Sequence, residues 1–515
     1  MDRRRFLALA AHASAAGTLA RSAFGAAPLR HDPFGLGVAS GDPGPDGFVL
    51  WTRLLALDDP LPATALPVRW EVAEDAAFRR IVQRGSSLAR PELAHSVHVE
   101  VAGLAPGRWY HYRFTHGPAA SRVGRARTAP GLNELPPHLR LAFASCQRWE
   151  HGHYAAWGHV ANDAPDLVLF LGDYIYEYAT PTDTTGLART HTLRHARSLD
   201  DFRDRYALHK SDPQLQVAHA ACPWAVTWDD HEVQNDYAGD TGHDSSAAFS
   251  ALRSAGFQAF YEHMPLGAAC LAAPDFASLQ LHRRLAWGQL VQMHLLDGRQ
   301  YRDRQACRRV QASGAGAVRP GDCAELAQSS RSFLGTAQER WLDAGLAQDA
   351  RQDTRWSVLA QQTLFSPRHY PSGLQSTDTW DGYPSARARL TQSMARHVPG
   401  SAVVLGGDIH QNYVCRVPAD DLEPEGKVVA SEFCGTSISS RSGTTQEKLD
   451  AIVRHNPHVL LARCGERGYG LADITAQLWT TRLQALDDPL RADSGMRTLA
   501  RFVVERGRPG PVREE

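Results

Sequence analysis

The sequence predicts an α/β protein in which a small all-β domain precedes a larger α/β domain. Residues 34–129 contain short segments in which apolar and polar residues alternate, a pattern typical of half-buried strands. From residue 137 onward, short and nearly continuous apolar runs alternate with helical stretches, and such runs are typical of strands buried on both faces. The chain has 515 residues, which suffices for two or three domains. The usual size is about 100–200 residues per domain.

The first part of the chain, residues 30–130, is predicted to form a β-sandwich. Its clearest strands are residues 68–72, 96–101 and 109–114. Leu104-Ala105-Pro106 precedes Tyr110 in a way that resembles the tyrosine corner of fibronectin-type domains. A proline-containing segment that ends at Pro137 is predicted to be a linker, so we expect the second domain to span residues 137–515.

Five apolar runs in the second domain end in polar corners. They are residues 141–144, 167–171, 225–228, 291–296 and 403–405. Open α/β sheets bind ligands outside the carboxyl ends of their strands, so all five corners can face one crevice. The pattern therefore predicts one functional site that draws on distant segments of the chain.

The first 27 residues have the pattern of a signal peptide. Arg3-Arg4-Arg5-Phe6-Leu7 opens an apolar stretch that runs to about Ala20, and small residues follow at Ala23 and Gly25. Paired arginines before Phe-Leu match a twin-arginine signal, which predicts the twin-arginine export machinery as a partner and a periplasmic or extracellular location. An N-terminal amphipathic helix is the alternative. Because no second apolar run of 18 residues follows, we expect no stable membrane span.

The charge balance excludes some classes of function. Lys+Arg 55 against Asp+Glu 56 gives a net charge of −1, so nucleic-acid binding is not expected. Lys427 follows a glycine but precedes Val428, so the phosphate-binding loop of P-loop nucleotide hydrolases is absent there.

The chain has eight cysteines, too few for a disulfide-rich scaffold. Cys307 and Cys323 flank a loop rich in small residues and are the best candidates for a bridge, although spacing alone does not determine the pairing.

Acidic and metal-binding side chains gather at the corners. They are Asp173, Tyr176, Asp229, Asp230, His231, Glu232, Asp408 and His410, with Cys146 and Asn235 close by in sequence. Any one of them has an ordinary explanation as a helix cap or a buried polar residue. Together, so many carboxylates would repel one another unless cations lie between them. Oxygen donors favour hard cations, whereas imidazole, thiolate and phenolate favour iron or zinc, so the mixed set predicts more than one metal ion.

These residues lie within motifs that resemble the PhoD-type alkaline phosphatases and phosphodiesterases, relatives of the metallophosphoesterases and purple acid phosphatases. The motifs are GLGVASGDPGPDGFVLWTR (35–53), FASCQ (143–147), GDYIYE (172–177), WDDHEVQND (228–236), LDGRQYR (296–302), WDGYP (380–384), GGDIHQN (406–412) and SEFCGT (431–436). The resemblance covers nearly the whole chain. It implies a four-layer α/β/β/α metallophosphoesterase sandwich after the small β domain.

The resemblance also implies Fe³⁺ together with one or two Ca²⁺ ions. The residues that match iron ligands are Cys146, Asp173, Tyr176 and His410, and those that match calcium ligands are Asp230, Asn235 and Asp408. Whether Asp229 or Asp230 is the ligand stays open; the position directly before His231 is the one that resembles the family, and Asp229 is then expected to orient His231. Ser145-Cys146 replaces the Asp-x-His of the wider superfamily, which agrees with an iron–thiolate site. A ferric ion bound by Tyr176 would give a visible colour.

The implied reaction is hydrolysis of small phosphate esters by a metal-bound hydroxide or oxide. His231 or Arg299 would stabilise the charge at phosphorus or protonate the leaving oxygen, although a structural ion pair is equally open for Arg299. Substrate preference stays open among monoesters, diesters and phospholipids. The loop 180–198 and the tail after Arg463 are expected to control access, with residues 468–470 in a hairpin or a lid.

Other chemistries fit less well. Gly435-Thr436-Ser437-Ile438-Ser439 lacks the closing glycine of a serine-hydrolase motif, and Asn235 replaces the second histidine of a zinc-peptidase motif. A secreted metal- or phosphate-binding protein without turnover is the non-enzymatic alternative, and a phospholipase-type diesterase is the enzymatic one.

Overall fold

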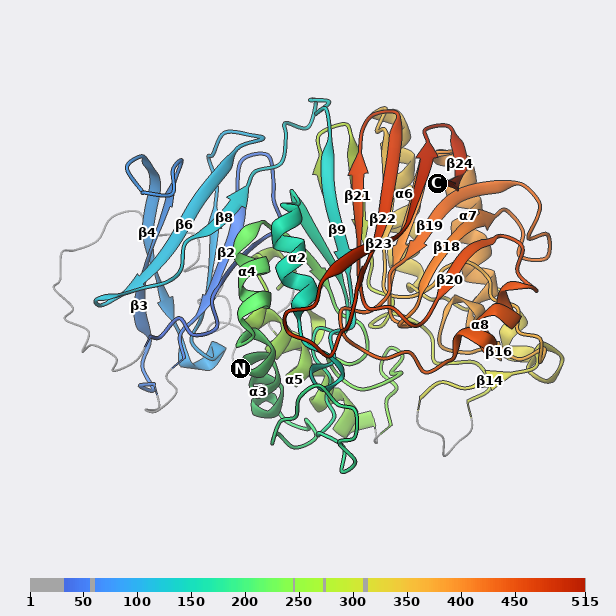
Figure 1. The fold of residues 1–515 in the computed structure, drawn as a ribbon, viewed down its shortest axis with the longest axis horizontal. Helices are drawn as coiled ribbons and strands as arrows, with labels where there is room; N and C mark the ends of the chain where they lie inside the picture. The colour runs from blue at the N-terminus through green and yellow to red at the C-terminus, as the bar shows by residue number, and fades with distance from the viewer. Residues whose placement is uncertain (1–31, 56–60, 244–245, 272–274, 309–313, 515) are drawn as a thin grey trace.

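Two large sheets lie face to face in the middle of the molecule, and helices cover their outer faces (Figure 1). The computed structural model describes residues 32–55, 61–243, 246–271, 275–308 and 314–514. The predicted signal peptide, residues 1–27, lies outside the described residues.

The larger sheet has ten strands in the order β24-β23-β22-β21-β9-β10-β11-β1-β2-β5. Their bounds are β1 Val38–Gly41, β2 Phe48–Arg53, β5 Ser96–Val101, β9 Leu139–Ala144, β10 Leu167–Leu171, β11 Trp224–Thr227, β21 Gly468–Ile474, β22 Leu478–Leu486, β23 Met496–Glu505 and β24 Arg508–Glu514. Strands β9, β10 and β11 are parallel to one another. Their carboxyl ends therefore lie at the same edge of the sheet.

The second sheet has seven strands in the order β12-β13-β15-β17-β19-β18-β20. Their bounds are β12 Arg283–Trp287, β13 Val291–Leu295, β15 Trp356–Ala360, β17 Ala402–Gly406, β18 Asn412–Pro418, β19 Val428–Cys434 and β20 Val459–Arg463. Strands β13, β15, β17 and β19 are parallel. The five predicted corners thus follow strands of two sheets and not of one.

Two smaller sheets complete the β structure. A five-stranded sheet contains β3 Leu66–Ala73, β4 Ile81–Ala89, β6 Trp109–His116, β7 Ala119–Ala120 and β8 Gly124–Arg127. The other pairs β14 Ala317–Val318 with β16 Gln375–Ser376.

The helices divide between the outer faces of the two large sheets. Their bounds are α2 Ala155–Asp163, α3 Leu199–Lys210, α4 Pro213–Ala221, α5 Ser246–His263, α6 Thr336–Arg351, α7 Pro384–His397 and α8 Gln446–Val453. Short 3-10 turns are η1 Pro91–Leu93, η2 Trp149–His151, η3 Ala268–Cys270, η4 Phe276–Ser278, η5 Pro320–Asp322, η6 Ala324–Ala327 and η7 Trp380–Gly382. Local sequence specifies some of the starts: the Asp212 side chain caps α4 by accepting from the amides of Gln214 and Leu215, and Pro213 follows at the first position.

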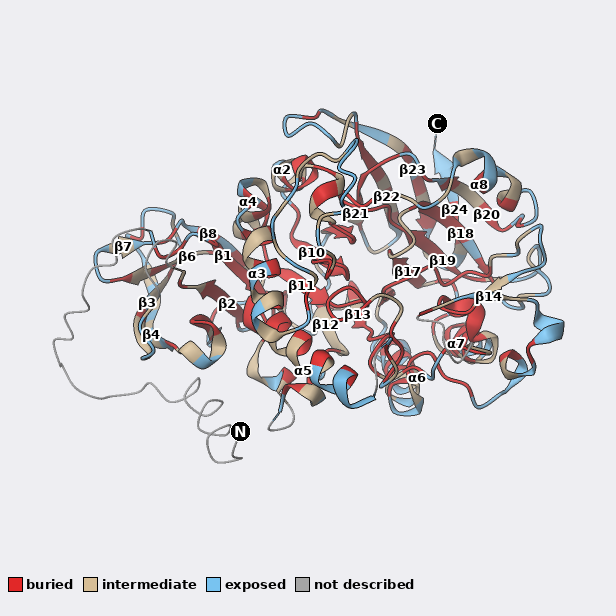
Figure 2. Cartoon of the chain, turned by 90° about the horizontal axis from the view of Figure 1, so that it is seen from below, coloured by how far each residue is buried: buried red, intermediate tan, exposed pale blue. Residues whose placement is uncertain are grey.

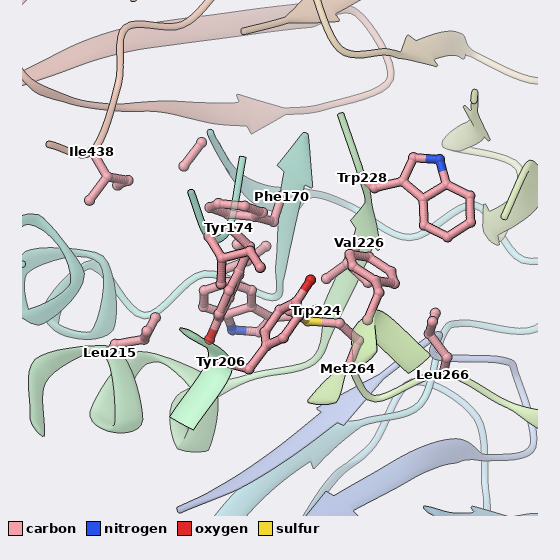
Figure 3. Packing of buried hydrophobic residues seen from close by; sticks show 14 of the residues in the cluster. Phe170, Tyr174, Tyr206, Leu215, Trp224, Val226, Trp228, Met264, Leu266 and Ile438 are labelled. Atoms are coloured by element: carbon pink, nitrogen blue, oxygen red, sulfur yellow. The ribbon is translucent and has the colours of Figure 1, made fainter. Parts of the chain in front are cut away.

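Three hydrophobic clusters separate four layers. Between α2–α5 and the ten-stranded sheet lies an aromatic cluster that includes Phe170, Trp224 and Tyr206 (Figure 3). A second cluster joins the facing sides of the two sheets, with Leu169 on one and Val403 on the other. The third joins the seven-stranded sheet to α6 and α7. This arrangement confirms the predicted four-layer α/β/β/α sandwich.

The N-terminal region is all-β, as predicted, but it shares a sheet with the rest of the chain. The five-stranded sheet packs on β1, β2 and β5, which continue the ten-stranded sheet through the pairing of Gly41 with Trp224. A Cβ at Gly41 would lie 2.4 Å from the carbonyl oxygen of Pro265, so only glycine permits this approach. The domain limits 30–130 and 137–515 stay a prediction. The pairing of β1 with β11 joins the two predicted domains in one sheet.

Two local predictions are confirmed, and a third, which left two alternatives open, is decided in favour of one of them. The Tyr110 hydroxyl accepts a hydrogen bond from the amide of Ala105 at 3.1 Å, which forms the predicted tyrosine corner. Cys307 and Cys323 are joined by a disulfide. Residues 468–470 belong to a hairpin of β21 and β22 and not to a lid, because β21 lies buried between β22 and β9. Among the described residues, none of the helices has both the length and the apolar character needed to span a bilayer.

Candidate metal centre

The predicted corners meet where the carboxyl ends of the two central sheets face each other. Strands β9, β10 and β11 lead into Cys146, Asp173 and Asp229, and β17 of the other sheet leads into Asp408 and His410. Seen from below, β10, β11, β13 and β17 lie close together among buried residues (Figure 2).

Their side chains form three overlapping groups, and within each group the potential ligand atoms lie within 4.8 Å of one another. The groups are Cys146, Asp173 and His410; Asp173, Asp230 and His231; and Asp229, Asp230 and Asp408. Asp173 is shared by the first two groups and Asp230 by the last two. The donors therefore form one continuous row, from a thiol end at Cys146 to an all-oxygen end at Asp408.

Tyr176 and His410 complete the thiol end. The Tyr176 hydroxyl donates to Asp173 Oδ2 at 2.8 Å, lies 3.0 Å from His410 Nε2, and accepts from the Ser440 hydroxyl at 2.8 Å. His410 Nδ1 lies 2.8 Å from the carbonyl oxygen of Arg441 and donates to it. This contact leaves the lone pair on Nε2, which points toward Tyr176 and Asp173, the orientation of a ligating imidazole.

The backbone is strained at four of these residues. The φ angles are 60° at Cys146, 59° at Asp173, 65° at Asp408 and 56° at His410, all in the left-handed region that non-glycine residues rarely adopt. Each such residue costs on the order of 1–3 kcal/mol, and the cost is tolerated only where the surrounding structure holds the residue in place. Such clustering marks these corners as functional and not as ordinary turns.

Glu232 holds two of the corners together. Its carboxylate accepts hydrogen bonds from the backbone amides of Tyr174 at 2.5 Å, Asp229 at 2.8 Å and Asp173 at 3.2 Å. The side chain is fully buried. Glu232 therefore fixes the positions of Asp173 and Asp229 relative to each other without offering its oxygens to the row of donors.

The carboxylates of the row are charged groups without enough partners. Asp173 Oδ1, Asp229 Oδ2 and Asp230 Oδ1 are buried and make no hydrogen bond. Burial raises the pKa of Asp173 well above its usual range, with the nearby Asp230 and Asp229 raising it further. Burial likewise raises the pKa of Asp229 to about 8 and that of Asp408 to about 6. A cation among them would relieve both the desolvation and the repulsion.

Arg299 lies behind the all-oxygen end and is fully buried. Its guanidinium binds Asp229 at 2.5 Å and Asp378 at 2.9 Å, and Nη2 lies 3.7 Å from Asp230 Oδ2. Burial alone would raise the pKa of Asp230, but Arg299 and His231 hold it below its usual range. Arg299 thus occupies a network of ion pairs.

Glu177 holds the imidazole ring of His231 in place. Its Nδ1 lies 2.7 Å from Glu177 Oε2, and the other oxygen of Glu177 accepts from the backbone amide of Asn235 at 2.9 Å. Glu177 therefore ties His231 and Asn235 together. Asn235 itself is half-buried at the edge of the same segment, four residues after His231.

Sequence reasoning missed three residues of this centre. Glu177 directly follows Tyr176 and was detectable as the last residue of a motif, but its role depends on its contact with His231. Asp378 lies two residues before another motif and binds both Arg299 and Arg302 at 2.9 Å. Ser440 gave no signal, because its role comes from a contact with a residue 264 positions away.

Comparison with known proteins identifies the family. The sequence profile described as PhoD-like phosphatase matches residues 141–483, and the profile of the PhoD-like phosphatase N-terminal domain matches residues 18–130. The chain belongs to the PhoD-like phosphatase family. It is 41% identical over 492 residues to alkaline phosphatase D of Bacillus subtilis (strain 168), covering 93% of this chain and 82% of that protein.

Solved structures agree with this assignment. A structure of PhoD matches with a TM-score of 0.88 and 39% identity, over 95% of this chain and 94% of that one. The purple acid phosphatase PPD1 from yellow lupin (Lupinus luteus) matches with a TM-score of 0.56 and 11% identity, over 91% and 73% of the two chains, which shows a shared fold alone. Family membership confirms the predicted enzyme class, a metal-dependent phosphoester hydrolase, and favours turnover over a purely binding role.

Proposed function

We propose that this PhoD-like phosphatase hydrolyses small phosphate esters with one Fe³⁺ at the thiol end of the row and one or two Ca²⁺ at the all-oxygen end. The observation that carries this proposal is the position of Asp173, which belongs to both the group with Cys146 and the group with Asp230. A carboxylate with one unpaired, buried oxygen between two groups of donors is suited to bridge two cations.

The donors at the two ends differ in chemistry. Cys146, Tyr176 and His410 offer sulfur, phenolate and imidazole, which suit iron, whereas Asp230, Asp408 and Asn235 offer oxygen alone, which suits calcium. Of the two adjacent aspartates, Asp230 is the better ligand, since Asp229 is already paired with Arg299 at 2.5 Å. Such ions, when bound, draw charge from a phosphate ester and acidify water.

His231 is proposed as the proton donor to the leaving oxygen. Glu177 holds Nδ1, so the ring is fixed and Nε2 is the atom available for proton transfer. The aromatic ring of Tyr176 packs 4.1 Å from the His231 ring, which restricts its rotation further. Arg299 is proposed as a positioning residue, because its buried ion pairs with Asp229 and Asp378 orient the all-oxygen end and leave it no access to substrate.

Replacing His231 with glutamine tests this role through the leaving group. General acid catalysis is worth about a hundredfold or more, and it matters most when the leaving oxygen is poor. We expect kcat to fall about a hundredfold for an alkyl phosphate ester and much less for a p-nitrophenyl ester, with KM little changed. The same replacement at the exposed His455 serves as the control. Equal losses on both substrates would contradict the proton-donor role.

Rates on further substrates show which phosphate esters the enzyme hydrolyses. Rates on p-nitrophenyl phosphate and on bis-p-nitrophenyl phosphate separate monoesterase from diesterase activity, and a lysophospholipid tests the phospholipase alternative. The loop 180–198 is proposed to influence this choice. In support, the carbonyl oxygen of Gly186 accepts a hydrogen bond from Arg441, and the carbonyl oxygen of Arg441 accepts one from His410.

Export by the twin-arginine route to the periplasm or beyond is proposed from Arg3-Arg4-Arg5-Phe6-Leu7. The Cys307–Cys323 disulfide supports it, since such bonds persist in oxidising compartments. Substituting lysine for Arg4 and Arg5 together is expected to leave the protein in the cytoplasmic fraction. Normal export of that variant would exclude the twin-arginine route.

A further inference from the structure

The backbone of Asp236 fixes one oxygen of Asp230, a residue at the all-oxygen end. The Asp236 amide donates to Asp230 Oδ2 at 2.6 Å, while Asp230 Oδ1 is buried and has no hydrogen-bond partner. Asp230 belongs to two of the three groups of potential ligands. Asp236 has a φ of 54°, so its own conformation must be held by contacts from outside the segment.

Those contacts come from residues far away in sequence: Ala315, in the loop between Cys307 and Cys323, and Gln305, two residues before that loop. The amide of Ala315 donates to Asp236 Oδ2 at 3.1 Å, and the Gln305 side chain donates to the Asp236 carbonyl oxygen at 2.7 Å. Gly314 packs directly against the side chain, since a Cβ there would lie 2.8 Å from Asp236 Oδ2, and its φ of +81° also favours glycine. Gly314 and Ala315 therefore fit closely onto the Asp236 side chain.

The loop is held in turn by the disulfide. Cys307 and Cys323 close it, and the apolar residues around them form a small cluster with Ala306 and Leu326 that is separate from the main cores. The Cys307 amide also donates to Glu325 Oε2 at 2.7 Å. The disulfide restrains this region together with the pairing of β14 with β16 and the hydrogen bonds between Gly316 and Thr377.

We propose that this disulfide-closed loop positions Asp230 for cation binding, with Asp236 and Gly314 as the positioning residues that transmit the restraint. The inference rests on the proposed function, in that Asp230 is taken as a calcium ligand. It predicts that calcium affinity at this end depends on a disulfide whose cysteines belong to none of the three groups of potential ligands found among the described residues.

Calcium binding to the full-length protein, measured by calorimetry after removal of bound calcium, tests the proposal. Asp236→Ala, Gly314→Ala and the double variant Cys307→Ser/Cys323→Ser are each expected to weaken calcium binding about 10- to 100-fold, the usual effect of losing a residue that orients a ligand. Two variants serve as matched controls. Asp240→Ala replaces an exposed aspartate, and Gly316→Ala adds a Cβ that would meet no atom within 4 Å. Both should bind within about twofold of wild type, by the same reasoning.

Combining Asp236→Ala with the double cysteine variant distinguishes a linked path from separate effects. If Asp236 transmits the restraint, the combination should bind calcium about as weakly as Asp236→Ala alone, and iron content should stay unchanged in all variants. Losses that multiply, or variants that bind as tightly as wild type, would overturn this inference alone. A wild-type protein that binds no calcium would overturn the calcium assignment as well. If the cysteine variant fails to fold, Gly314→Ala against Gly316→Ala still tests the contact with Asp236, and calcium binding as tight as wild type in Gly314→Ala would overturn the inference.

Discussion

Replacing Asp173 with asparagine is expected to lower kcat/KM toward phosphate esters by about a thousandfold or more, which corresponds to about 4 kcal/mol of transition-state stabilisation. Asparagine keeps the shape of the side chain but removes its charge. Because Asp173 belongs to two of the three ligand groups and has a buried oxygen without a partner, the loss should affect both ends of the row. Steady-state kinetics, together with elemental analysis of iron and calcium, measure the effect.

A matched replacement separates this effect from a general loss of carboxylate charge. Asp200 lies on α3 with its side chain 86% exposed, and Asp200→Asn should retain full activity. An Asp173→Asn enzyme with normal metal content and near-normal kcat/KM would contradict the proposed role of Asp173 as a shared ligand.

Cys146→Ala is expected to remove iron and to leave calcium binding largely intact, because Cys146 lies only at the thiol end.

Removal of the proposed calcium with a chelator is expected to abolish activity and to lower the melting temperature. Without cations, Asp173, Asp229 and Asp230 keep buried oxygens that have no partner, and their charges oppose one another. A ligand that binds only the folded state stabilises it by about 4 kcal/mol when present at a thousand times its Kd. Titrating calcium into the chelated protein should therefore raise the melting temperature steadily with concentration, as scanning calorimetry measures.

The same titration on the Asp173→Asn protein provides the comparison. Its melting temperature should rise less at each calcium concentration, because one charge of the row is missing. A wild-type protein whose melting temperature and activity are unchanged by excess chelator would be evidence against a calcium requirement.

The strands that carry the site were predictable because their pattern is local. A run such as 167–171 is short and apolar at every position, which is typical of a strand covered on both faces; it forms β10 as expected. The polar residues that follow, such as Asp173 after β10 and Asp408 after β17, then lie at the carboxyl ends by the geometry of parallel sheets. The disulfide and the tyrosine corner were likewise indicated by neighbouring residues.

Other features depend on pairing between distant segments, which periodicity does not encode. The strand at 96–101 alternates like a sandwich strand, yet β5 is the edge of the ten-stranded sheet, because β1 meets β11 at Gly41. For Arg299, the motif left two roles open, and the ion pairs that support a positioning role join it to Asp229 and Asp378, 70 residues before it and 79 residues after it in the chain.

The candidate site residues and the ends of the strands that carry them were thus predictable from short-range patterns, since apolar burial and turn formation act over a few residues. Which sheet each strand joins, which carboxylate neutralises Arg299, and which residue orients His231 were set by three-dimensional packing. The physical reason is that a buried charge is tolerated only with a partner at hydrogen-bonding distance, and that partner is found by the folded chain as a whole.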